Sequence, residues 1–588
     1  MEVVIVEPGE GLPSQIFKER YARTAEETWV EACERVAEHI ANAEDNGKRT
    51  IYKEKFAKEL KSNRFMPGGR IWYGSGRSVA QLLNCFVVPG HDSREGWGKL
   101  LYDTCVISGT GGGIGANFSD VRGRGFAIKG TGGVSTGAVS LMKMQDSISN
   151  ELRQGGGRRA ALMQCLNVNH PDILEFLEVK LDKGELNNAN ISIVMNIDSE
   201  EFANKVKNDE DIELEFNGLK TGETISAKWL WNKLIENAYN SGDPGILNGY
   251  FANKMNNISY YESLISTNPC GEIWLGAYDC CCLGNLVLPR FVVDGKFDWD
   301  QFDETVRIGV RFLDNVLTIN DFPLPEIKEK CHYNRRVGLG VMGLHTMLLE
   351  LGLTYGSEEG LAFIDKLFHI MKNTSYDESI TLAAEKGPFP GYRPDFLKSN
   401  FVKGLKPALR NKIKHHGIRN CALLTVPPTG TTSMVSGNGV SSGIESLFAP
   451  AYYRRVRASD EMGRDYYYQE LVITDEYKKF GELAVGAYDI TLDDHLKTQA
   501  VIQKHIDNAV SKTINIPAEF PMEDLKDKLL EYLPHVKGMT IYRQGSKGLE
   551  PLEHIPVDKV KELLAEEHAK GNIEDQSIMD CVSGVCTI

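Results

Sequence analysis

From Phe65 onward, glycine-rich loops alternate with short apolar runs, and this alternation constrains the fold more than any other feature of the sequence. The segments NCFVVPG (84–90), GGGIGANFSDVRGRG (111–125) and RRVGLGVMGLHTMLLELG (335–352) are typical of strands that feed helices through loops. No fixed-period repeat or coiled-coil heptad stands out. The pattern predicts an α/β fold.

The two ends of the chain differ from this core. TAEETWVEACERVAEHIANAE opens with Thr24 and carries Glu27 three residues later, a capping-box spacing before an amphipathic run. Beyond about residue 550 the sequence is charged and poor in large apolar residues, which predicts a helical piece followed by a flexible tail. We therefore expect a helical segment over 1–60, the α/β core over 61–550 and a tail over 551–588.

Charge and hydropathy exclude several classes of protein. The formal net charge is −15, which argues against a nucleic-acid-binding surface, because such surfaces cluster Lys and Arg. No run of about 18 apolar residues is present that could span a bilayer. The N-terminus has acidic residues, Gly and Pro before any basic cluster, unlike a targeting signal. We expect a cytoplasmic protein with neither nucleic acid nor membrane as partner.

Three consecutive cysteines, Cys280, Cys281 and Cys282, lie within NPCGEIWLGAYDCCCLG (268–284). Neighbouring side chains of an extended segment point to opposite faces, and no second closely spaced cysteine pair lies nearby, so zinc is disfavoured. Buried packing is the simplest interpretation of Cys280 and Cys282.

Cys270, in the same stretch, is flanked at i−2 and i+2 by Asn268 and Glu272. On an extended segment these three side chains share one face. A carboxylate beside a thiol raises the pKa of the thiol, and the stretch has no histidine to act as a base. The trio therefore suits a cysteine that carries a hydrogen atom better than a thiolate nucleophile.

Four further motifs do not settle a function by themselves. CVSGVC (581–586) suits a mobile dithiol, or an adventitious metal site or oxidised pair. GTGGGIGANFS invites a dinucleotide reading but lacks the acidic residue about 20 positions later. PPTGTTS (427–433) is either a phosphate cradle before a helix or a Pro/Gly turn. RQGGGRRAALM (153–163) is either a phosphate or base-gating loop or a solvated charged loop.

Taken together, these segments resemble the catalytic subunit of ribonucleotide reductases, most closely the adenosylcobalamin-dependent class II enzymes. The matching segments, in chain order from about Phe65 to Ser546, are FMPGGRI, NCFV, GGGIGANFSDVRGRG, QGGGRR followed by HPDILEFL, STNPCGE, CCLGN, RRVGLGVMGL, PPTGTTS with SSGIE, and GMTIYR. The resemblance implies the fold of the glycyl radical enzymes and ribonucleotide reductases: a ten-stranded α/β barrel of two five-stranded halves, with a finger loop through its centre.

The resemblance also implies catalytic roles. Cys270 would carry the transient thiyl radical that removes the 3′-hydrogen of the substrate. Glu272 would take the proton of the 3′-hydroxyl, and Asn268 would hydrogen-bond the substrate. Cys85 and Cys281 would be the reducing pair that closes as a disulfide when the 2′-hydroxyl leaves as water.

Binding residues and the tail dithiol follow from the same resemblance. Cys581 and Cys586 match the tail pair that re-reduces the spent disulfide, itself served by a thioredoxin- or glutaredoxin-type reductant. The implied substrate-binding residues are Asn84, Pro428, Thr429, Gly430, Thr431, Thr432 and Ser433. The implied binding residues for a dNTP or ATP effector at the specificity site are Asp92, Ser93, Arg122 and Lys129. Gly130–Gly137 and Gln154–Arg159 fall where two loops would link effector to substrate choice.

Departures from the family pattern indicate the subtype. Class I enzymes pass the radical through two adjacent tyrosines, whereas here Thr540 and Ile541 precede Tyr542, which favours adenosylcobalamin as the radical source. Only about 60 residues precede the core, too few for an ATP-cone, and no large insertion follows Asp92, so we expect a homodimer. We expect ribonucleoside diphosphates as substrates. The alternatives are a class I-type subunit that needs a ferritin-like partner, and an inactive nucleotide-binding regulator on the same barrel.

Overall fold

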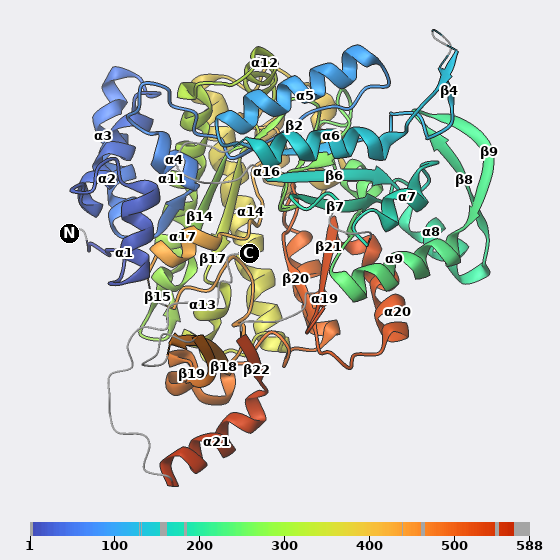
Figure 1. The fold of residues 1–588 in the computed structure, drawn as a ribbon. Helices are drawn as coiled ribbons and strands as arrows, with labels where there is room; N and C mark the ends of the chain where they lie inside the picture. The colour runs from blue at the N-terminus through green and yellow to red at the C-terminus, as the bar shows by residue number, and fades with distance from the viewer. Residues whose placement is uncertain are drawn as a thin grey trace.

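The computed structural model describes residues 4–128, 130, 132–152, 161–181, 185–437, 439–459, 465–546 and 552–569 (Figure 1). Its largest sheet has eight strands in the order β13-β2-β3-β6-β7-β10-β21-β20. A three-stranded sheet of order β1-β14-β17 lies beside it. The α/β class predicted from the loop pattern is confirmed.

Five neighbouring strands of the large sheet are parallel: β2 (Cys85–Val87), β3 (Gly113–Asn117), β6 (Leu162–Asn167), β7 (Ala189–Val194) and β10 (Gly245–Leu247). Their residues are mostly buried, as expected of strands covered on both faces. The main helices between them are α5 (Arg94–Gly109), α6 (Ala138–Glu151), α7 (Ile173–Glu178), α8 (Ser199–Asn208) and α9 (Ala227–Ser241). Antiparallel neighbours flank the five strands, β13 (Cys280–Cys281) on β2 and β21 (Gly538–Arg543) on β10, and β20 (Thr513–Ile516) pairs with β21.

The smaller sheet pairs β14 (Leu283–Val287) in parallel with β17 (Gly338–Met342) and antiparallel with β1 (Phe65–Pro67). Hydrogen bonding continues beyond β17, because Leu339 N donates to Leu423 O at 2.8 Å. Val426 in turn bridges Val510, three residues before β20 begins. Residues 422–426 and 508–511 therefore connect the smaller sheet toward the β20 edge of the larger one.

A hairpin of β11 (Ser266–Thr267) and β12 (Trp274–Leu275) passes between the two sheets. On one side, Asn117 Nδ2 at the end of β3 donates to Ile265 O at 2.9 Å. On the other side, Ala509 N donates to Glu272 O at 2.9 Å. The hairpin is thus held by both groups of strands.

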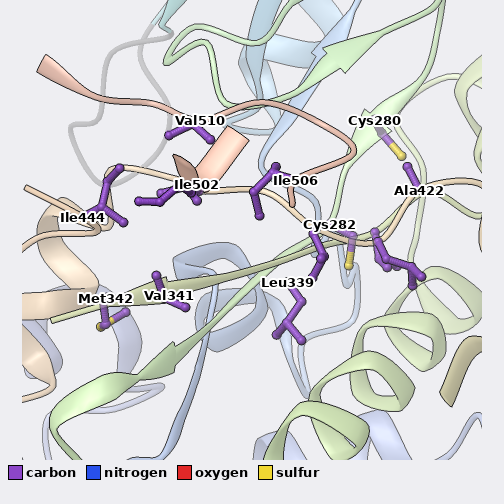
Figure 2. Packing of buried hydrophobic residues seen from close by; sticks show 14 of the residues in the cluster. Cys280, Cys282, Leu339, Val341, Met342, Ala422, Ile444, Ile502, Ile506 and Val510 are labelled. Carbon is purple, nitrogen blue, oxygen red and sulfur yellow. The ribbon is translucent and has the colours of Figure 1, made fainter. Parts of the chain in front are cut away.

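Long helices cover the smaller sheet, chiefly α11 (Trp299–Ile319) and α14 (Glu358–Lys386) (Figure 1). Figure 2 shows the core on this side, where Leu339 and Val341 of β17 share one buried cluster with Ile502 of α19 (Leu492–Gln503) and with Ile506. The other helices of this half are α12 (Pro325–Asn334), α13 (Leu344–Glu350), α15 (Asn400–Lys403), α16 (Pro407–His416), α17 (Gly430–Val435) and α18 (Asp475–Phe480). α20 (Met522–Tyr532) lies against α9 on the side of the large sheet, where Trp231 Nε1 donates to Lys526 O at 3.3 Å (Figure 1).

The N-terminal segment is helical, with α1 (Leu12–Ile16), α2 (Trp29–Ala41), α3 (Asn46–Lys61) and α4 (Gly69–Gly74). The capping box predicted at Thr24 and Glu27 is wrong. The box forms at the equally spaced Thr28 and Glu31, where Thr28 Oγ1 accepts from Glu31 N at 3.2 Å and Glu31 Oε2 accepts from Thr28 N at 2.8 Å. Glu27 instead forms an ion pair of 2.6 Å with Arg35.

The C-terminal part contains a strand that the sequence did not predict. β22 (Leu552–Ile555) pairs with β18 (Ala451–Ser459), which pairs with β19 (Asp465–Ile473), all antiparallel. Because β22 is formed by pairing with a segment about a hundred residues away, local composition gave no signal for it. The expected helical piece is α21 (Val557–Ala569). Within the part of the chain that the structure describes, no helix is both long and apolar enough to cross a bilayer.

Candidate functional site

Cys270 lies at the tip of the β11–β12 hairpin. The hairpin enters beside Asn117, the last residue of β3, and reaches Gly113, the first residue of that strand, where a Cβ would lie 3.0 Å from Pro269 Cγ. Asn190 Nδ2, near the start of β7, donates to Pro269 O at 2.8 Å. Cys270 is exposed at this tip. It therefore lies at the amino ends of the five parallel strands.

Glycines on β3 make room for the hairpin. A Cβ on Gly115 would lie 1.8 Å from Thr267 O, far inside any contact distance. On the opposite side, a Cβ on Gly338 of β17 would lie 3.4 Å from Ile273 Cδ1, beside the other arm of the hairpin. The glycines of GGGIGAN thus allow a close backbone approach, but the neighbour is the chain's own hairpin rather than a phosphate.

The expectation that residues 268–272 are extended is wrong. Gly271 has φ +80°, and its N–H donates to Asn268 O at 3.1 Å, so the segment turns at the hairpin tip. Asn268 Oδ1 also accepts from Ile273 N at 3.2 Å. The turn buries Asn268 and Glu272 and leaves Cys270 between them exposed.

Glu272 is a buried carboxyl group with unused hydrogen-bonding capacity. Burial raises the pKa of Glu272 to about 7, and its own backbone N–H and the nearby Asn268 amide offset this only in part. Among the described residues, neither Glu272 Oε2 nor Asn268 Nδ2 has a partner at normal hydrogen-bond distance. Both groups lie next to Cys270 in the sequence and have capacity left for a hydrogen bond to a bound polar molecule.

Cys85 and Cys281 face each other on neighbouring strands. They are Cα partners in the β2–β13 pairing, and both are free thiols. A Cβ on Gly113 would lie 3.1 Å from Cys85 Sγ, so the pair lies close to the hairpin tip. Burial, the hydrogen-bonded Cys85 and the Glu272 carboxylate raise the pKa of Cys281. Two adjacent neutral thiols can form a disulfide across the strand pair.

Cys280 and Cys282 belong to a different environment from Cys281. Both lie in the main hydrophobic core, where Figure 2 shows them, whereas Cys281 packs in a separate cluster with Val87 and Ile273. A hydrogen bond with Cys331 and burial raise the pKa of Cys280. Within the described ranges, no three His, Cys, Asp or Glu side chains are grouped as metal ligands.

The PPTGTTS segment forms a tight turn into α17. Thr429 has φ +59°, and its Oγ1 accepts from Gly443 N at 2.7 Å, while Ser442 Oγ donates to Pro428 O. The hydroxyls of Thr432 and Ser433 donate to carbonyls at the start of the helix, Thr429 O and Gly430 O, each at 3.0 Å, and Thr431 Oγ1 is 2.7 Å from Tyr21 OH. The four hydroxyl groups thus already form hydrogen bonds within the protein. The backbone N–H groups at the start of α17 are therefore the donors that can bind a ligand.

Asn84 belongs to the Cys85 end of the site. Its Oδ1 is buried and has no partner within the described part of the chain. Its backbone O accepts from Gly113 N at 2.9 Å, and its backbone N lies 3.4 Å from Cys281 O. Asn84 is therefore grouped with the cysteine pair and the hairpin tip.

The expected effector residues lie beyond the carboxyl ends of β2 and β3. Asp92 and Arg122 form an ion pair of 2.8 Å, and Arg122 N donates to Asp92 Oδ1 at 3.2 Å. Ser93 Oγ caps α5 by accepting from Gly96 N at 2.9 Å. In the 130–137 loop, β5 (Gly133–Val134) pairs with β4 (Ala127–Ile128), while Lys129 lies outside the described residues, as do Thr131 and Gln154–Arg159.

Tyr542 lies on β21, paired with Asn515 of β20. Met539 and Ile541 are buried, whereas Thr540 and Tyr542 alternate with them and are not fully buried. Thr540 and Tyr542 thus lie on the face of β21 that points away from the core. Cys581 and Cys586 lie outside the described residues.

Sequence reasoning missed three residues that support this site. Asn285, paired with Gly340, has a buried Oδ1 without a partner in the described chain. Asn285 is the last residue of the quoted CCLGN motif, and that was the available signal. Glu445 accepts from Lys512 Nζ at 2.9 Å and from Thr513 N at 2.7 Å, fixing the segment that holds Thr429. Glu445 lies in the quoted SSGIE motif, whereas Lys512 carried no sequence signal.

Comparisons with known proteins point to one family. The model described as ribonucleotide reductase, all-alpha domain, matches residues 12–80, and the one described as ribonucleotide reductase, barrel domain, matches residues 83–542. A vitamin B12-dependent ribonucleoside-diphosphate reductase of Mycobacterium tuberculosis (strain ATCC 25618 / H37Rv) is 32% identical over 92% of this chain and 78% of its own length. A vitamin B12-dependent ribonucleoside-diphosphate reductase of Thermoplasma acidophilum is 35% identical over 85% of this chain and 66% of its own length. A ribonucleoside-diphosphate reductase large chain of Encephalitozoon cuniculi is 29% identical over 66% of this chain and 56% of its own length.

Proposed function

This chain belongs to the ribonucleotide reductase family, and on that premise we propose that it converts ribonucleoside diphosphates to 2′-deoxyribonucleotides for DNA synthesis by thiyl radical chemistry. One observation carries the proposal. The hairpin tip brings Cys270 to the end of the sheet where Cys85 and Cys281 face each other and where Glu272 is buried with an unpartnered oxygen.

Each of these side chains has a role that its surroundings support. Cys270, exposed at the tip, takes the 3′-hydrogen of the substrate as a thiyl radical. Glu272, whose pKa of about 7 lets it gain and lose a proton near neutrality, takes the proton of the 3′-hydroxyl. Asn268 binds the substrate through its unpartnered Nδ2.

Cys85 and Cys281 provide the reducing equivalents. Their two thiols lose two electrons as the disulfide forms: one proton of the pair leaves with the 2′-hydroxyl as water, and the second hydrogen takes the place of that hydroxyl on C2′. Cys270 then returns the 3′-hydrogen to the product. Their position as cross-strand partners allows the disulfide without a change in strand pairing. Cys581 and Cys586 then exchange with the spent disulfide, and a thioredoxin- or glutaredoxin-type protein reduces them.

Adenosylcobalamin is the proposed radical source; the relatives at 32–35% identity are named vitamin B12-dependent reductases, which supports this choice. When bound, it supplies the radical by homolysis of its cobalt–carbon bond. The residues fit this cofactor because Cys270 is exposed at the tip, where a large group can approach it. The class I alternative is not supported, since Thr540 and Ile541 precede Tyr542 in place of a tandem tyrosine.

The same proposal extends to the architecture. We infer that the strands close into a ten-stranded barrel with the hairpin as its central finger loop. The bridges Leu339–Leu424 and Val426–Val510 support this closure on one side. On the other, β13 is separated from β14 by one residue. The division into a helical segment (1–60), this barrel (61–550) and a tail (551–588) belongs to the same proposal.

Binding roles complete the proposal. The turn at 428–433, with Asn84, holds the substrate and its diphosphate. Asp92, Ser93, Arg122 and Lys129 bind a dNTP or ATP effector at the interface of a homodimer. The Asp92–Arg122 ion pair supports this placement, because the two residues already lie together at one edge of the sheet.

The proposal is tested with the full chain, adenosylcobalamin, a dithiol and a ribonucleoside diphosphate. Deoxynucleotide formation is expected without a second protein, and a Cys270→Ser variant is expected to form none. Cys105→Ser, which alters another exposed cysteine on α5, is the matched control and should retain activity. Activity only after addition of a second protein would overturn the choice of cofactor.

A further inference from the structure

One face of α14 carries charged and polar side chains that the proposed reaction does not use. Asp365, His369 and Lys372 follow one another at spacings of four and three residues, so they lie on the same side of the helix. This side meets the segment after α19, where His505 Nε2 lies 2.8 Å and Lys504 Nζ lies 3.2 Å from Asp365 Oδ1. The rings of His369 and His505 are in edge contact, with their centroids 5.8 Å apart. Side chains from two elements are thus gathered at one place.

Lys372 is a buried cation without an anionic partner. The residue is 7% exposed, and its ammonium group forms no hydrogen bond or ion pair with any residue that the structure describes. The centroid of the Phe401 ring lies 5.7 Å from Lys372 Nζ. A buried lysine without a partner is uncommon, because the lost hydration of its charge is not replaced. Burial and then the charge of Lys504 lower the pKa of Lys372, so a bound anion would stabilise its charged form.

Two carboxylates act electrostatically on Lys372, but neither forms an ion pair with it in the described part of the chain. Asp365 is engaged at Oδ1 by both side chains of the segment after α19. Asp507 Oδ1 accepts from Leu424 N at 2.8 Å, and Asp507 Oδ2 accepts from Tyr376 OH at 2.8 Å. These bonds use both oxygens of Asp507 and hold it where it is. The described residues therefore leave Lys372 available to an anion from solution.

Further positive charge lies around Lys372. Lys504 has a side chain that is 68% exposed, and Lys406, just before α16, is also exposed. Burial and then the charges of Lys372 and Lys406 lower the pKa of His369, and Lys504 adds to this effect. Lys372 Nζ is not sealed from solvent, so a small anion can reach it. Three lysines and Asp365 give a local excess of positive charge in a chain whose formal net charge is −15.

The cluster is held in place by the hydrophobic core beneath it. Ile502 and Ile506, on either side of the lysine and histidine that follow α19, belong to the main core cluster (Figure 2). On α14, Leu367, Phe368 and Met371 belong to the same cluster. Both elements are therefore fixed without a ligand, as is usual for binding sites that are formed in advance.

We propose that Lys372, Lys406 and Lys504 bind a phosphate group, either as inorganic phosphate or as part of a phosphorylated small molecule. Lys372 supplies the buried positive charge, and the two exposed lysines contact the outer oxygens. Ammonium groups bind phosphate as point charges, and the two negative charges of phosphate match the local positive excess. The inference goes beyond the proposed reaction, because none of these residues belongs to the proposed substrate or effector sites.

Equilibrium dialysis of the full chain against radiolabelled inorganic phosphate tests the proposal by counting sites. The parent is expected to bind one more phosphate per chain than Lys372→Met, with saturation of this site below about 1 mM. Lys228→Met, which removes an exposed lysine of α9, is the matched control and should bind as many phosphates as the parent. Equal numbers of sites with equal affinities in the parent and Lys372→Met would overturn the proposal.

A second variant does not alter the buried part of the cluster. Lys504→Glu changes an exposed side chain and places a negative charge beside the site, so it is expected to weaken phosphate binding there at least about tenfold. Unchanged binding in this variant would contradict the assignment of Lys504.

Competition identifies the form in which phosphate is bound. Displacement of the label at lower concentrations of ribose 5-phosphate than of unlabelled phosphate would support a phosphorylated small molecule, and the reverse order would support free phosphate. Acetate carries a single charge and is expected to compete at least about tenfold more weakly. Acetate that competes as well as phosphate would refute the choice of ligand.

Thermal unfolding gives an independent readout. Without phosphate, Lys372→Met is expected to melt at a higher temperature than the parent, because it removes an unpaired buried charge. Phosphate should narrow this gap, because it stabilises the parent through a site that the variant lacks. A gap that phosphate leaves unchanged would refute the inference. None of these measurements needs turnover, so their failure would leave the proposed reaction untouched.

Discussion

At the scale of single residues, the site depends on which thiols and carboxyls are neutral. Glu272 is fully buried, and its pKa of about 7 allows both protonation states near neutral pH. Cys281 is held neutral by burial and by its neighbours Cys85 and Glu272. A radical mechanism needs thiols that give up hydrogen atoms, and this environment suppresses the thiolate that would compete.

Replacing Glu272 with Gln is expected to lower turnover by about 100-fold or more, because a positioned base contributes about that much. In the parent, the rate should rise through about pH 7 as Glu272 loses its proton, and the variant should lack this limb. A pH–rate profile of both proteins checks the assignment. An identical rise in the variant would contradict it.

The same residue affects stability with a defined sign. Burial raises the pKa of Glu272 in the folded state from its ordinary value of 4.5 to about 7, so the folded protein binds more protons than the unfolded chain between these values. The free energy of unfolding should therefore fall as pH rises across this window. Glu272→Gln should be more stable than the parent at pH 8, and the gap should narrow at pH 5, as measured by urea unfolding.

Neighbouring cysteines provide a matched pair of variants. Cys281→Ser should stop multiple turnover, because the disulfide with Cys85 cannot form. Cys282→Ser, equally buried but in the main core, should keep its turnover rate even if its melting temperature falls. Equal loss of activity in both variants would show that general packing, rather than the Cys85–Cys281 pair, explains the defect.

At the scale of elements, the central feature is the β11–β12 hairpin. Sequence reasoning placed Cys270, Asn268 and Glu272 together because their spacing is local. The premise of an extended segment failed because Gly271 takes a positive φ, and the turn buries Asn268 and Glu272 while exposing Cys270. Local spacing thus identified the residues but not their conformation.

The glycine-rich strands show why other features could not be predicted. The glycines of GGGIGAN indicate that another group comes close to the backbone there. A single sequence does not reveal which group this is. The structure has Thr267 O against Gly115, from a segment about 150 residues away. Long-range pairings such as β22 with β18, and the support of Thr429 by Glu445 and Lys512, escaped prediction for the same reason.

Gly115→Ala tests this element directly. Its Cβ would meet Thr267 O at 1.8 Å, so the strand or the hairpin must shift. We expect unfolding to become easier by about 1–3 kcal/mol or more and activity to fall at least about tenfold. Gly47→Ala in α3, where a Cβ meets nothing within 4 Å, is the control and should be neutral or stabilising by up to about 1 kcal/mol. Denaturant unfolding and turnover are measured for both variants, and a Gly115→Ala protein as stable and active as Gly47→Ala would contradict the prediction.

At the scale of the whole molecule, the site is assembled from segments spread along the chain. Cys85, Cys281 and the hairpin tip at Pro269 and Cys270 come together only when the large sheet and the hairpin are in place, and the turn at 428–433 is proposed to complete the site. The motifs could be identified from the sequence, and their roles could be predicted from the family resemblance. How the two sheets approach the hairpin could be seen only in the structure. The expected effector residues Asp92 and Arg122 lie beyond the opposite ends of the strands, so effector control must cross the molecule.

The proposed homodimer makes a prediction at this scale. Adding a dNTP should shift the chain toward dimer in sedimentation velocity experiments, because the effector is proposed to bind at the interface. Arg122→Ala, which removes the partner of Asp92, should weaken this shift and flatten the dNTP dependence of turnover. Effector response without any association would contradict the interface placement.

The proposed mechanism requires Cys270 to remove the 3′-hydrogen of a ribonucleotide. The decisive measurement compares turnover of ordinary and 3′-deuterated ribonucleoside diphosphate by the full chain with adenosylcobalamin and a dithiol. Deoxynucleotide formation is expected to be slower from the deuterated substrate, and Cys270→Ser is expected to form none from either substrate. A Cys270→Ser protein that forms deoxynucleotide at the parent's rate would contradict it.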